Sequence, residues 1–313
     1  MITHGKKQIS EIVYARKASE GGGAVRLTNI IRGAQVVFGG LKPSFAWLEK
    51  ATKAAILAAF GAEEGDAVIK ATNYYLNVLA ATNSNKASAL AGFINEDPML
   101  VCSLGLQSQG VQMPIRWLVG DGNAYINTGI VMKDLSHIFE VTCRWNGTNT
   151  GAFQTIFGFM ESNTIPRLGL HQYQGNMMFG TNSTVITSCA VDKVARDYIY
   201  NATTGNVSRR NIGSVDFSSI GKSGTDTSSF SENTLPIFLF ARNNGGHNNG
   251  YEGDVARFKD NDSIELIPFK SATREGMVDL VNAAFHPNQG TGHFTIAYTL
   301  PDGTPWTPLN QTP

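Results

Sequence analysis

The clearest indication of the fold comes from residues 235–258, LPIFLFARNNGGHNNGYEGDVARF. An apolar run that starts after Pro236 ends in a cluster of Asn and Gly, which is typical of a buried strand followed by a turn. Residues 253–258 then alternate, which predicts a second strand with Val255 on one face and Ala256 and Phe258 on the other. Two strands joined by such a polar loop favour a β-sandwich that carries its function on loops at one rim.

The rest of the chain after residue 115 supports a mainly β fold. Charged residues make up only 16% of the chain and there are 33 glycines, a composition that favours many turns with uncharged loops. Short segments of strand type alternate with turns at the spacing of a sandwich or jelly roll. The predicted strands are 115–119, 124–128, 138–145, 155–160, 167–172, 176–180, 184–187, 197–201, 206–212, 236–241, 250–259, 263–270, 276–279 and 292–297, and residues 214–233 are expected to form a long loop.

The first hundred residues have a different character. Residues 9–13 match residues 27–31 in type, which predicts a β-ribbon docking arm over 1–42 with a net charge of +5. An edge ribbon packed on its own domain is the alternative. Residues 43–100 show helical spacing and predict a helical hairpin with a short third helix near 87–94. We expect residues 101–114 to be a linker, 115–298 the sandwich, and 299–313 an extended Pro-rich tail.

Charge, hydropathy and cysteine content exclude several classes of function. The formal net charge is zero, so nothing predicts a nucleic-acid partner, and no apolar run is long enough for a membrane span. The segment MITHGKKQISEIV has no apolar core after its lysines, so we expect no signal peptide. Cys102, Cys143 and Cys189 are widely spaced and are expected to be small buried hydrophobic residues rather than a disulfide framework.

Several motifs, in order, resemble one family. DGNAYINTGI at residues 121–130 resembles the opening strand of concanavalin A-like, laminin-G-like jelly rolls, with Asn127 where Asp is usual. FARN at 240–243 and YEGDVARF at 251–258 look like its paired late strands. LIP at 266–268, GMVD at 276–279 and GTGHF at 290–294 resemble the closing segment of the variants found in gut Bacteroidales and their phages, with Val278 in place of an aromatic residue.

The resemblance covers about residues 115–297 and implies a sandwich that often binds glycans. The N-terminal repeat also resembles short β-ribbon modules found near the start of phage virion proteins, and cell lysis releases virion proteins that have no signal peptide. We therefore expect a phage virion structural protein, such as a head fibre or a tail-associated protein, made in the host cytoplasm and located in the virion. Residues 1–100 would then bind other virion proteins, and we expect a homo-oligomer, with a trimer favoured. A stand-alone carbohydrate-binding protein is the alternative, and a divergent glycanase is a third reading.

The polar loop supplies the candidate ligand-binding residues. A sugar site needs a concave rim, an aromatic ring and a few fixed polar groups. The set of this type is Asn243, Asn244, His247, Asn248, Asn249 and Tyr251. A mobile surface loop is the alternative reading of the same residues. Laminin-G-like modules often hold a calcium ion on a rim, so the resemblance makes Asp121 and Asp254 candidate calcium ligands; no other cofactor is expected.

Catalysis is not expected from this sequence. Glycoside hydrolases of related fold place carboxylates at alternate positions of one strand, and an acid and a second carboxylate must flank the scissile bond. The nearest pattern is Glu252-x-Asp254, and Ala256 stands where a third carboxylate would be. His286 and His293 flank a Gly-rich turn without an evident third metal ligand. We therefore predict a binding protein, not an enzyme.

Overall fold

The computed structural model describes residues 3–4, 7–8, 47–106, 111–145, 153–161, 167–173, 175–181, 184–190, 194–222, 233–248 and 250–311. The chain divides into two compact units. One comprises Met1–Val101, Leu106–Val111 and Pro308–Pro313, and the other comprises Cys102–Gly105 and Gln112–Thr307. Of the predicted N-terminal arm, the structure describes a short antiparallel pair, β1 (Thr3–His4) with β2 (Lys7–Gln8). The remainder of the arm lies outside the described residues.

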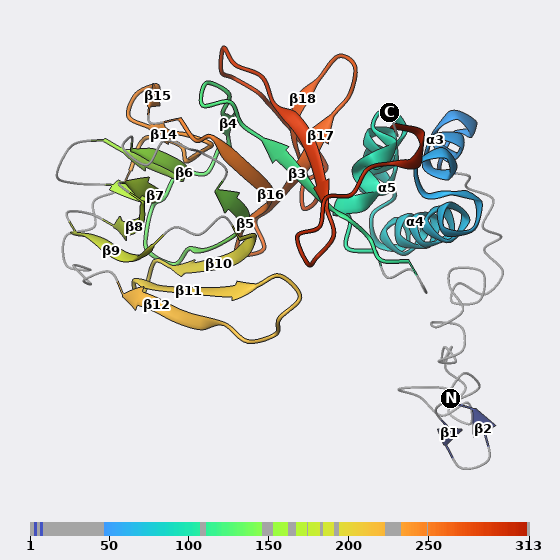
Figure 1. Cartoon of the computed structure of the whole chain (residues 1–313), viewed down its shortest axis with the longest axis horizontal. Helices are drawn as coiled ribbons and strands as arrows, with labels where there is room; N and C mark the ends of the chain where they lie inside the picture. Colours follow the sequence, from blue (N-terminus) through green and yellow to red (C-terminus); the bar gives the residue numbers. More distant parts are fainter. Residues whose placement is uncertain are drawn as a thin grey trace. The chain divides into compact units, whose positions relative to one another are not determined.

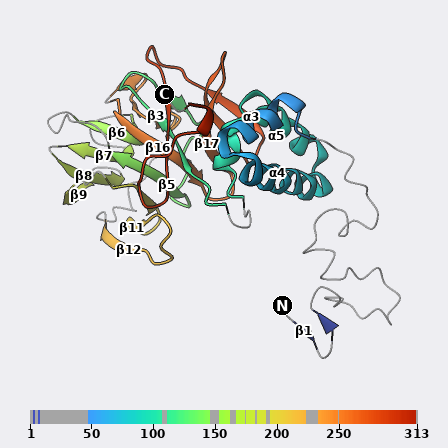
Figure 2. The ribbon, with the colours of Figure 1, turned by 45° about the vertical axis from the view of Figure 1, so that its right-hand side comes forward.

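The first unit contains three helices, α3 (Lys50–Phe60), α4 (Ala62–Thr82) and α5 (Ser84–Glu96), which lie side by side in Figure 2. A 3₁₀ turn, η3 (Pro98–Ser103), follows. Gly61, with φ of 89°, separates α3 from α4, a conformation that glycine adopts without strain. Asn83 begins α5 because its side chain accepts a hydrogen bond from Lys86 N at 2.9 Å. The third helix is therefore longer than the short segment that we expected over 87–94.

Apolar side chains on facing sides of the helices form the core of this unit, and Ile56, Val68, Leu76 and Ile94 are completely buried. Asn95 caps the N-terminus of α3, since its side-chain oxygen accepts hydrogen bonds from Glu49 N and Thr52 Oγ1. A C-terminal 3₁₀ turn, η5 (Leu309–Gln311), contacts α3. None of the described helices is both long enough and apolar enough to span a bilayer.

The second unit is built from two sheets in the described part of the chain. The ten-stranded sheet contains β3 (Ile115–Val119), β5 (Ile138–Trp145), β10 (Arg196–Asn201), β11 (Asn206–Asn211), β12 (Ser218–Lys222), β16 (Gly253–Asp260), β17 (Ile264–Lys270), β18 (Glu275–Asp279), β19 (Ala284–Pro287) and β20 (Thr295–Thr299). The eight-stranded sheet contains β4 (Ile126–Asn127), β6 (Gln154–Met160), β7 (Arg167–Tyr173), β8 (Asn176–Thr181), β9 (Thr184–Ala190), β13 (Phe238–Leu239), β14 (Arg242–Asn243) and β15 (His247–Asn248).

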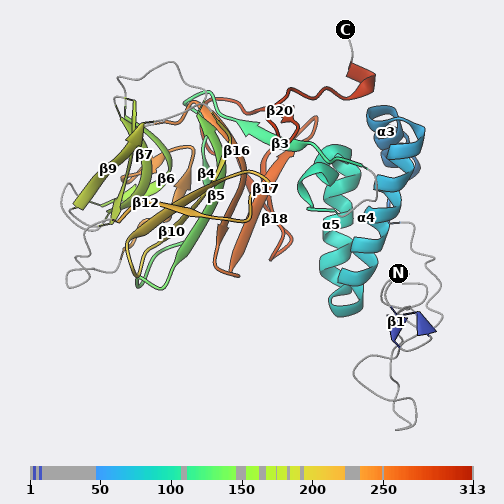
Figure 3. The same ribbon diagram turned by 60° about the horizontal axis from the view of Figure 1, so that its bottom comes forward.

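The two sheets pack face to face. In Figures 1 and 3 the green and yellow strands β6–β9 form one layer, and β5, β10 and β16 lie in the other. The core between them is aromatic: the rings of Phe139, Phe157 and Phe258 lie 5.4–6.0 Å apart, centroid to centroid. The prediction of a mainly β chain with a jelly-roll sandwich is thus confirmed.

Strand β16 contains a bulge, so the regular alternation that we expected over 253–258 is wrong. Its register with β5 shifts between Val255 and Arg257, so Ala256 is the extra residue. Because the bulge adds one residue, Val255 and Phe258 both belong to the core rather than to opposite faces. Asp254 and Arg257 consequently share the outer face, opposite Arg144 and Thr142 of β5.

The strand expected over 236–241 is also interrupted, and it forms β13 and β14 instead. Phe240, between them, has φ of 63°, which is uncommon for a residue with a side chain. Its ring is fully buried against Phe294 and Tyr251, and its N–H donates to Ile156 O at 2.7 Å. Tertiary packing therefore fixes a backbone conformation that local alternation does not predict.

Two segments expected to be irregular are ordered by backbone hydrogen bonds. Residues 218–222, placed in the predicted 214–233 loop, form β12 on the edge of the larger sheet, because strand pairing needs only backbone groups. The predicted extended tail of residues 299–313 begins with a turn after β20, in which Leu300 N donates to Thr304 O at 2.7 Å and Trp306 N donates to Tyr298 O at 3.1 Å.

Removing one ring of the aromatic core tests this architecture. We expect Phe258→Ala to lower the free energy of unfolding by about 3–5 kcal/mol, because a buried ring is lost and a cavity remains. Urea unfolding followed by near-UV circular dichroism measures the change. Val215→Ala is the control, since Val215 is 83% exposed and its loss should change stability by less than about 0.5 kcal/mol. A Phe258→Ala loss as small as that of the control would contradict the described core.

Candidate functional site

The structure divides the predicted sugar-binding residues into structural and exposed groups. Asn243 is 97% buried; its side-chain amide donates to Pro236 O at 2.8 Å, and its oxygen accepts from Gly245 N at 3.0 Å. Tyr251 is completely buried, and its hydroxyl donates to Arg144 O at 2.6 Å. Burial raises the pKa of Tyr251 well above its ordinary value. Both residues therefore hold the rim together from inside and do not face a ligand.

The remaining members of the set lie on the β14–β15 hairpin. Asn244 and His247 are exposed and Asn248 is half-buried, whereas Asn249 lies outside the described residues. The ring of His247 is 5.2 Å from that of Tyr125, and the partial burial of this exposed histidine's ring lowers its pKa. Residues of this hairpin line neither of the two cavities described below. The hairpin thus presents the polar groups of Asn244 and His247 at its exposed tip.

The two candidate calcium ligands are both engaged by protein donors. Asp121 Oδ1 accepts hydrogen bonds from Asn123 N and Ala124 N, and Oδ2 accepts one from His293 N at 2.8 Å. Burial opposes ionisation of Asp121, but these backbone N–H groups outweigh it and lower the pKa of the carboxyl. Asp254 is fully buried against Arg144. These residues do not fit a calcium site, because calcium needs six or more free oxygen ligands.

The described carboxylates and histidines outside the rim were also compared with the needs of a metal site. Among the described residues, no three His, Cys, Asp or Glu side chains are grouped closely enough to hold a metal ion. Glu275 is bound by Lys270 Nζ at 2.8 Å, Asn288 Nδ2 at 2.8 Å and His293 Nδ1 at 3.2 Å. Burial raises the pKa of Glu275, but these hydrogen bonds outweigh it and lower the pKa overall. The network fixes the loop between β19 and β20 to the start of β18.

A cleft on the outer side of the larger sheet is the best-formed candidate site. Its volume is about 460 Å³, within the range of small-molecule sites in proteins. It lies where β5 ends, β10 begins, β11 ends and the turn after β20 closes. The lining residues are Arg144, Val194, Ala195, Asn211, Ile212, Pro301, Asp302 and Gly303.

Arg144 is held rigidly at this cleft. Its Nε and Nη2 both donate to Asp254 Oδ2, with the Nε distance at 2.8 Å, and its guanidinium lies 5.4 Å from the centre of the Trp117 ring. Trp117 is itself fixed, because its Nε1 donates to Thr299 Oγ1 at 2.9 Å. No described residue accepts a hydrogen bond from Nη1, and 21% of the Arg144 side chain is exposed. The cleft therefore contains a pre-oriented donor.

Asp302 supplies an acceptor at the same cleft. It lies on the turn after β20, and its Oδ1 accepts a hydrogen bond from Thr304 N at 2.9 Å. Hydrogen bonds from the backbone N–H and the hydroxyl of Thr304 lower the pKa of Asp302, so the carboxylate stays ionised in neutral solution. A fixed donor, an acceptor and several apolar side chains thus line one concavity.

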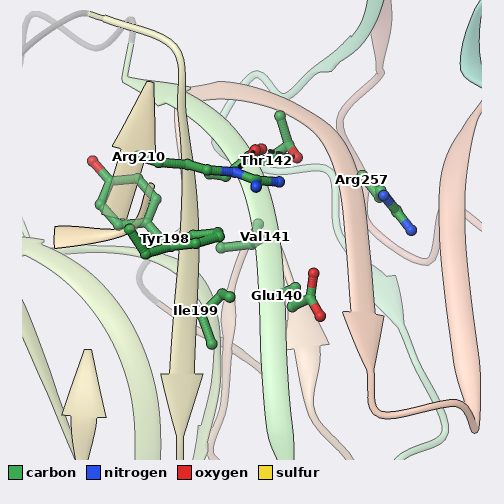
Figure 4. Close-up of a pocket in the computed structure, with 9 residues that line it drawn as sticks. Glu140, Val141, Thr142, Tyr198, Ile199, Arg210 and Arg257 are labelled. Atoms are coloured by element: carbon green, nitrogen blue, oxygen red, sulfur yellow. Dashed lines mark hydrogen bonds and ion pairs between the residues drawn. The ribbon is translucent and has the colours of Figure 1, made fainter. Parts of the chain in front are cut away.

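A second depression on the same sheet is too small for a ligand. Figure 4 shows it between β5, β10, β11 and β16, with Arg210 and Thr142 among its walls. Asp197 binds both, through Thr142 Oγ1 at 2.7 Å and Arg210 Nε at 2.9 Å. The volume is about 20 Å³, which suits a single water molecule.

Sequence reasoning missed Arg144, Asp302 and the cleft itself. A signal for Arg144 was present, because residues 138–145 alternate and Arg144 falls on the polar side of a strand whose other side is Phe139, Val141 and Cys143. Nothing in the sequence indicated that Asp302, 158 positions later in the chain, would line the same cleft.

Comparisons with known proteins give only distant structural likenesses. No family model matches the chain, and no curated protein matches it. It is similar to the CBM40 of Ruminococcus gnavus IT-sialidase at 11% identity, with 48% of this chain and 92% of that chain covered and a TM-score of 0.35. A SAP-like pentraxin from Limulus polyphemus gives 7% identity, 61% and 97% coverage, and a TM-score of 0.35.

A third likeness is to the enzymatically active domain of tailspike protein 2 of bacteriophage CBA120. Identity is 14%, with 54% of this chain and 30% of that chain covered and a TM-score of 0.31. All these TM-scores are low, so the likenesses carry no weight in assigning a ligand.

One ion pair at the far end of β16 makes stability depend on pH. His137 Nδ1 lies 2.8 Å from Asp260 Oδ2, and this hydrogen bond raises the pKa of His137 despite its partial burial. A raised pKa in the folded state means that the protonated histidine stabilises the fold. This contribution is complete below pH 6.5 and is lost as the pH rises through the raised pKa.

We therefore expect Asp260→Asn to remove most of the stability loss that the parent chain shows as the pH rises from 6.5. Thermal unfolding midpoints across this window measure the effect. Asp262→Asn, at a fully exposed carboxylate in the adjoining turn, should leave the pH dependence unchanged. Parallel pH profiles for the parent chain and Asp260→Asn would refute the assignment to this pair.

Proposed function

We propose that the sandwich binds glycans in the cleft between Arg144 and Asp302. The observation that carries this proposal is a concavity of about 460 Å³ that contains a guanidinium already fixed by a buried carboxylate and a tryptophan ring. Pre-orientation matters because a donor that is already ordered loses little entropy when a ligand binds.

The chemistry of the lining matches that of a sugar. A hydroxyl group both donates and accepts hydrogen bonds, so it can accept from Arg144 Nη1 and donate to the Asp302 carboxylate. Asn211, which is exposed at the end of β11, offers both a donor and an acceptor. Val194, Ile212 and Pro301 provide apolar surface for the C–H groups of a sugar ring. The described lining residues include no aromatic side chain, so we expect weak binding.

We also propose that the bound glycan is not cleaved. Hydrolysis needs two carboxyl groups that flank the scissile bond. Of the Glu252 and Asp254 pair, Asp254 is fully buried and committed to Arg144, whereas Glu252 is exposed and lies on the other side of Gly253. Among the described residues that line the cleft, Asp302 is the one carboxylate. This arrangement supports binding without catalysis.

The setting that we propose is a phage virion, in which residues 1–100 attach the chain to the particle and the sandwich is displayed. Support comes from the division of the chain, because the helices have a core of their own and the sandwich has another. Attachment and glycan binding can then be separate. A homo-oligomer, with a trimer favoured, remains part of this proposal, and a stand-alone carbohydrate-binding protein is the alternative.

Arg144→Lys tests the site without removing the buried charge pair. Lysine keeps a cation for Asp254 but loses the planar fork that places Nη1 in the cleft. We expect binding of the best ligand from a glycan array to weaken about tenfold or more, measured by isothermal titration calorimetry. Arg257→Lys makes the same exchange on the same face, outside the cleft, and should bind like the parent chain. Equal affinities for both variants would place the site elsewhere.

Particle association is tested by truncation. We expect a chain that starts at residue 112 to be absent from purified phage particles, because it lacks the proposed attachment unit, while the full chain is detected in them by mass spectrometry. The full chain carrying Arg144→Lys is the control and should be incorporated normally. Incorporation of the truncated chain as fully as the whole one would disprove the attachment role. Absence of the full chain from particles would favour the stand-alone alternative.

A further inference from the structure

Part of the lining of the cleft is a row of residues that crosses three neighbouring strands. Arg196, at the start of β10, pairs with Cys143 of β5 and with Asn211 of β11. One residue further in the same register, three residues follow as neighbours and line the cleft, namely Arg144, Ala195 and Ile212. These three are the first row. They belong to the outer face of the sheet, because Cys143 on the other side of β5 is in the core.

A second row adjoins the first, two residues further along each of the three strands. It consists of Thr142, Asp197 and Arg210, which pair in register and line the small depression. Asp197 joins them, because Oδ1 accepts from Thr142 Oγ1 at 2.7 Å and Oδ2 accepts from Arg210 Nε at 2.9 Å. Two residues of a strand span about 6.7 Å, which is close to the length of one sugar unit.

A third row continues in the same direction. Ile199 of β10 pairs with Glu140 of β5 and with Ser208 of β11. Figure 4 shows Thr142 and Arg210 close together, with Glu140 and Ile199 farther along the same strands. Glu140 and Ile199 also line the depression. The outer face thus carries a track of three rows that begins in the cleft.

We infer that the ligand of the cleft is an oligosaccharide rather than a single sugar, and that its chain continues from the first row over the second. This inference rests on the proposed function and adds the length and the course of the ligand to it. The two linings adjoin, since Asn211 belongs to the cleft and Arg210, the preceding residue of β11, belongs to the depression.

The depression suits one hydroxyl group of the second sugar. Its volume of about 20 Å³ holds a single water molecule, and a hydroxyl oxygen is of the same size and also both donates and accepts. A sugar hydroxyl in this position keeps the hydrogen bonds that a water would make there, so displacing water costs little affinity. The fixed groups around it are the Asp197 carboxylate, the Thr142 hydroxyl and the guanidinium of Arg210. Ile199 offers apolar surface beside them.

Oligosaccharides of increasing length test the inference on the full chain. The probes are cello-, malto-, xylo- and chito-oligosaccharides of one to five units, and affinities are measured by isothermal titration calorimetry. Within any series that binds, we expect affinity to rise about three- to tenfold from one unit to three, as one or two added hydrogen bonds would give.

Thr142→Val is the decisive variant. Valine keeps the shape of the side chain and suits a strand, but it removes the hydroxyl from the second row. We expect it to lower the affinity for three-unit ligands about three- to tenfold and to leave that for single sugars unchanged. Binding of single sugars also reports that the cleft is intact, so a folding defect is distinguished from loss of the second row.

Thr295→Val is the matched control. It makes the same exchange at an exposed position of β20, outside both linings, and should bind every length like the parent chain. Single sugars that bind as tightly as three-unit ligands would overturn the inference while leaving glycan binding intact. A Thr142→Val variant that behaves like the control, or that weakens all lengths equally, would overturn it as well. If no member of any series binds, the proposed function fails first, and this inference falls with it.

Discussion

The register of β16 on β5 is the constraint on which the sandwich and its cleft depend. One extra residue, Ala256, allows Val255 and Phe258 to enter the core together. The same bulge places Asp254 and Arg257 together on the outer face. Without it, the alternation of a regular strand would put either an aromatic ring in solvent or a carboxylate in the core. Core packing and site chemistry are therefore set by a single irregularity.

The position of Arg144 follows from that register. Asp254 lies directly opposite it, and Trp117 lies close to its guanidinium. Breaking a buried ion pair of this kind costs about 3–5 kcal/mol, because the remaining charge has lost its partner. The guanidinium is consequently held in place by forces that stabilise the fold itself. A ligand in the cleft would meet a donor that has little freedom left to lose.

Residue type alone could not separate scaffold from site in the Asn-rich loop. Asparagine suits turns and sugar contacts equally, because its amide can bond either to backbone or to a ligand. The side-chain amide of Asn243 donates a hydrogen bond to Pro236 O and accepts one from Gly245 N. The hydroxyl of Tyr251 donates to Arg144 O. Both residues are structural because their side chains are buried, and the burial of a loop residue depends on neighbours that are distant in the sequence. The loop looked like a site because its composition is also that of a well-built turn.

Local periodicity and turn residues were enough to predict the class of fold, the order of most strands and the change from helices to strands near residue 115. β3 and β5 occupy the predicted segments. Contacts between distant segments were needed to reveal the bulge at Ala256, the positive φ of Phe240 and the proximity of Arg144 to Asp254 and Asp302. These features join residues that are far apart along the chain. The sequence of a strand shows which side chains share a face, but strand pairing and packing determine which faces meet.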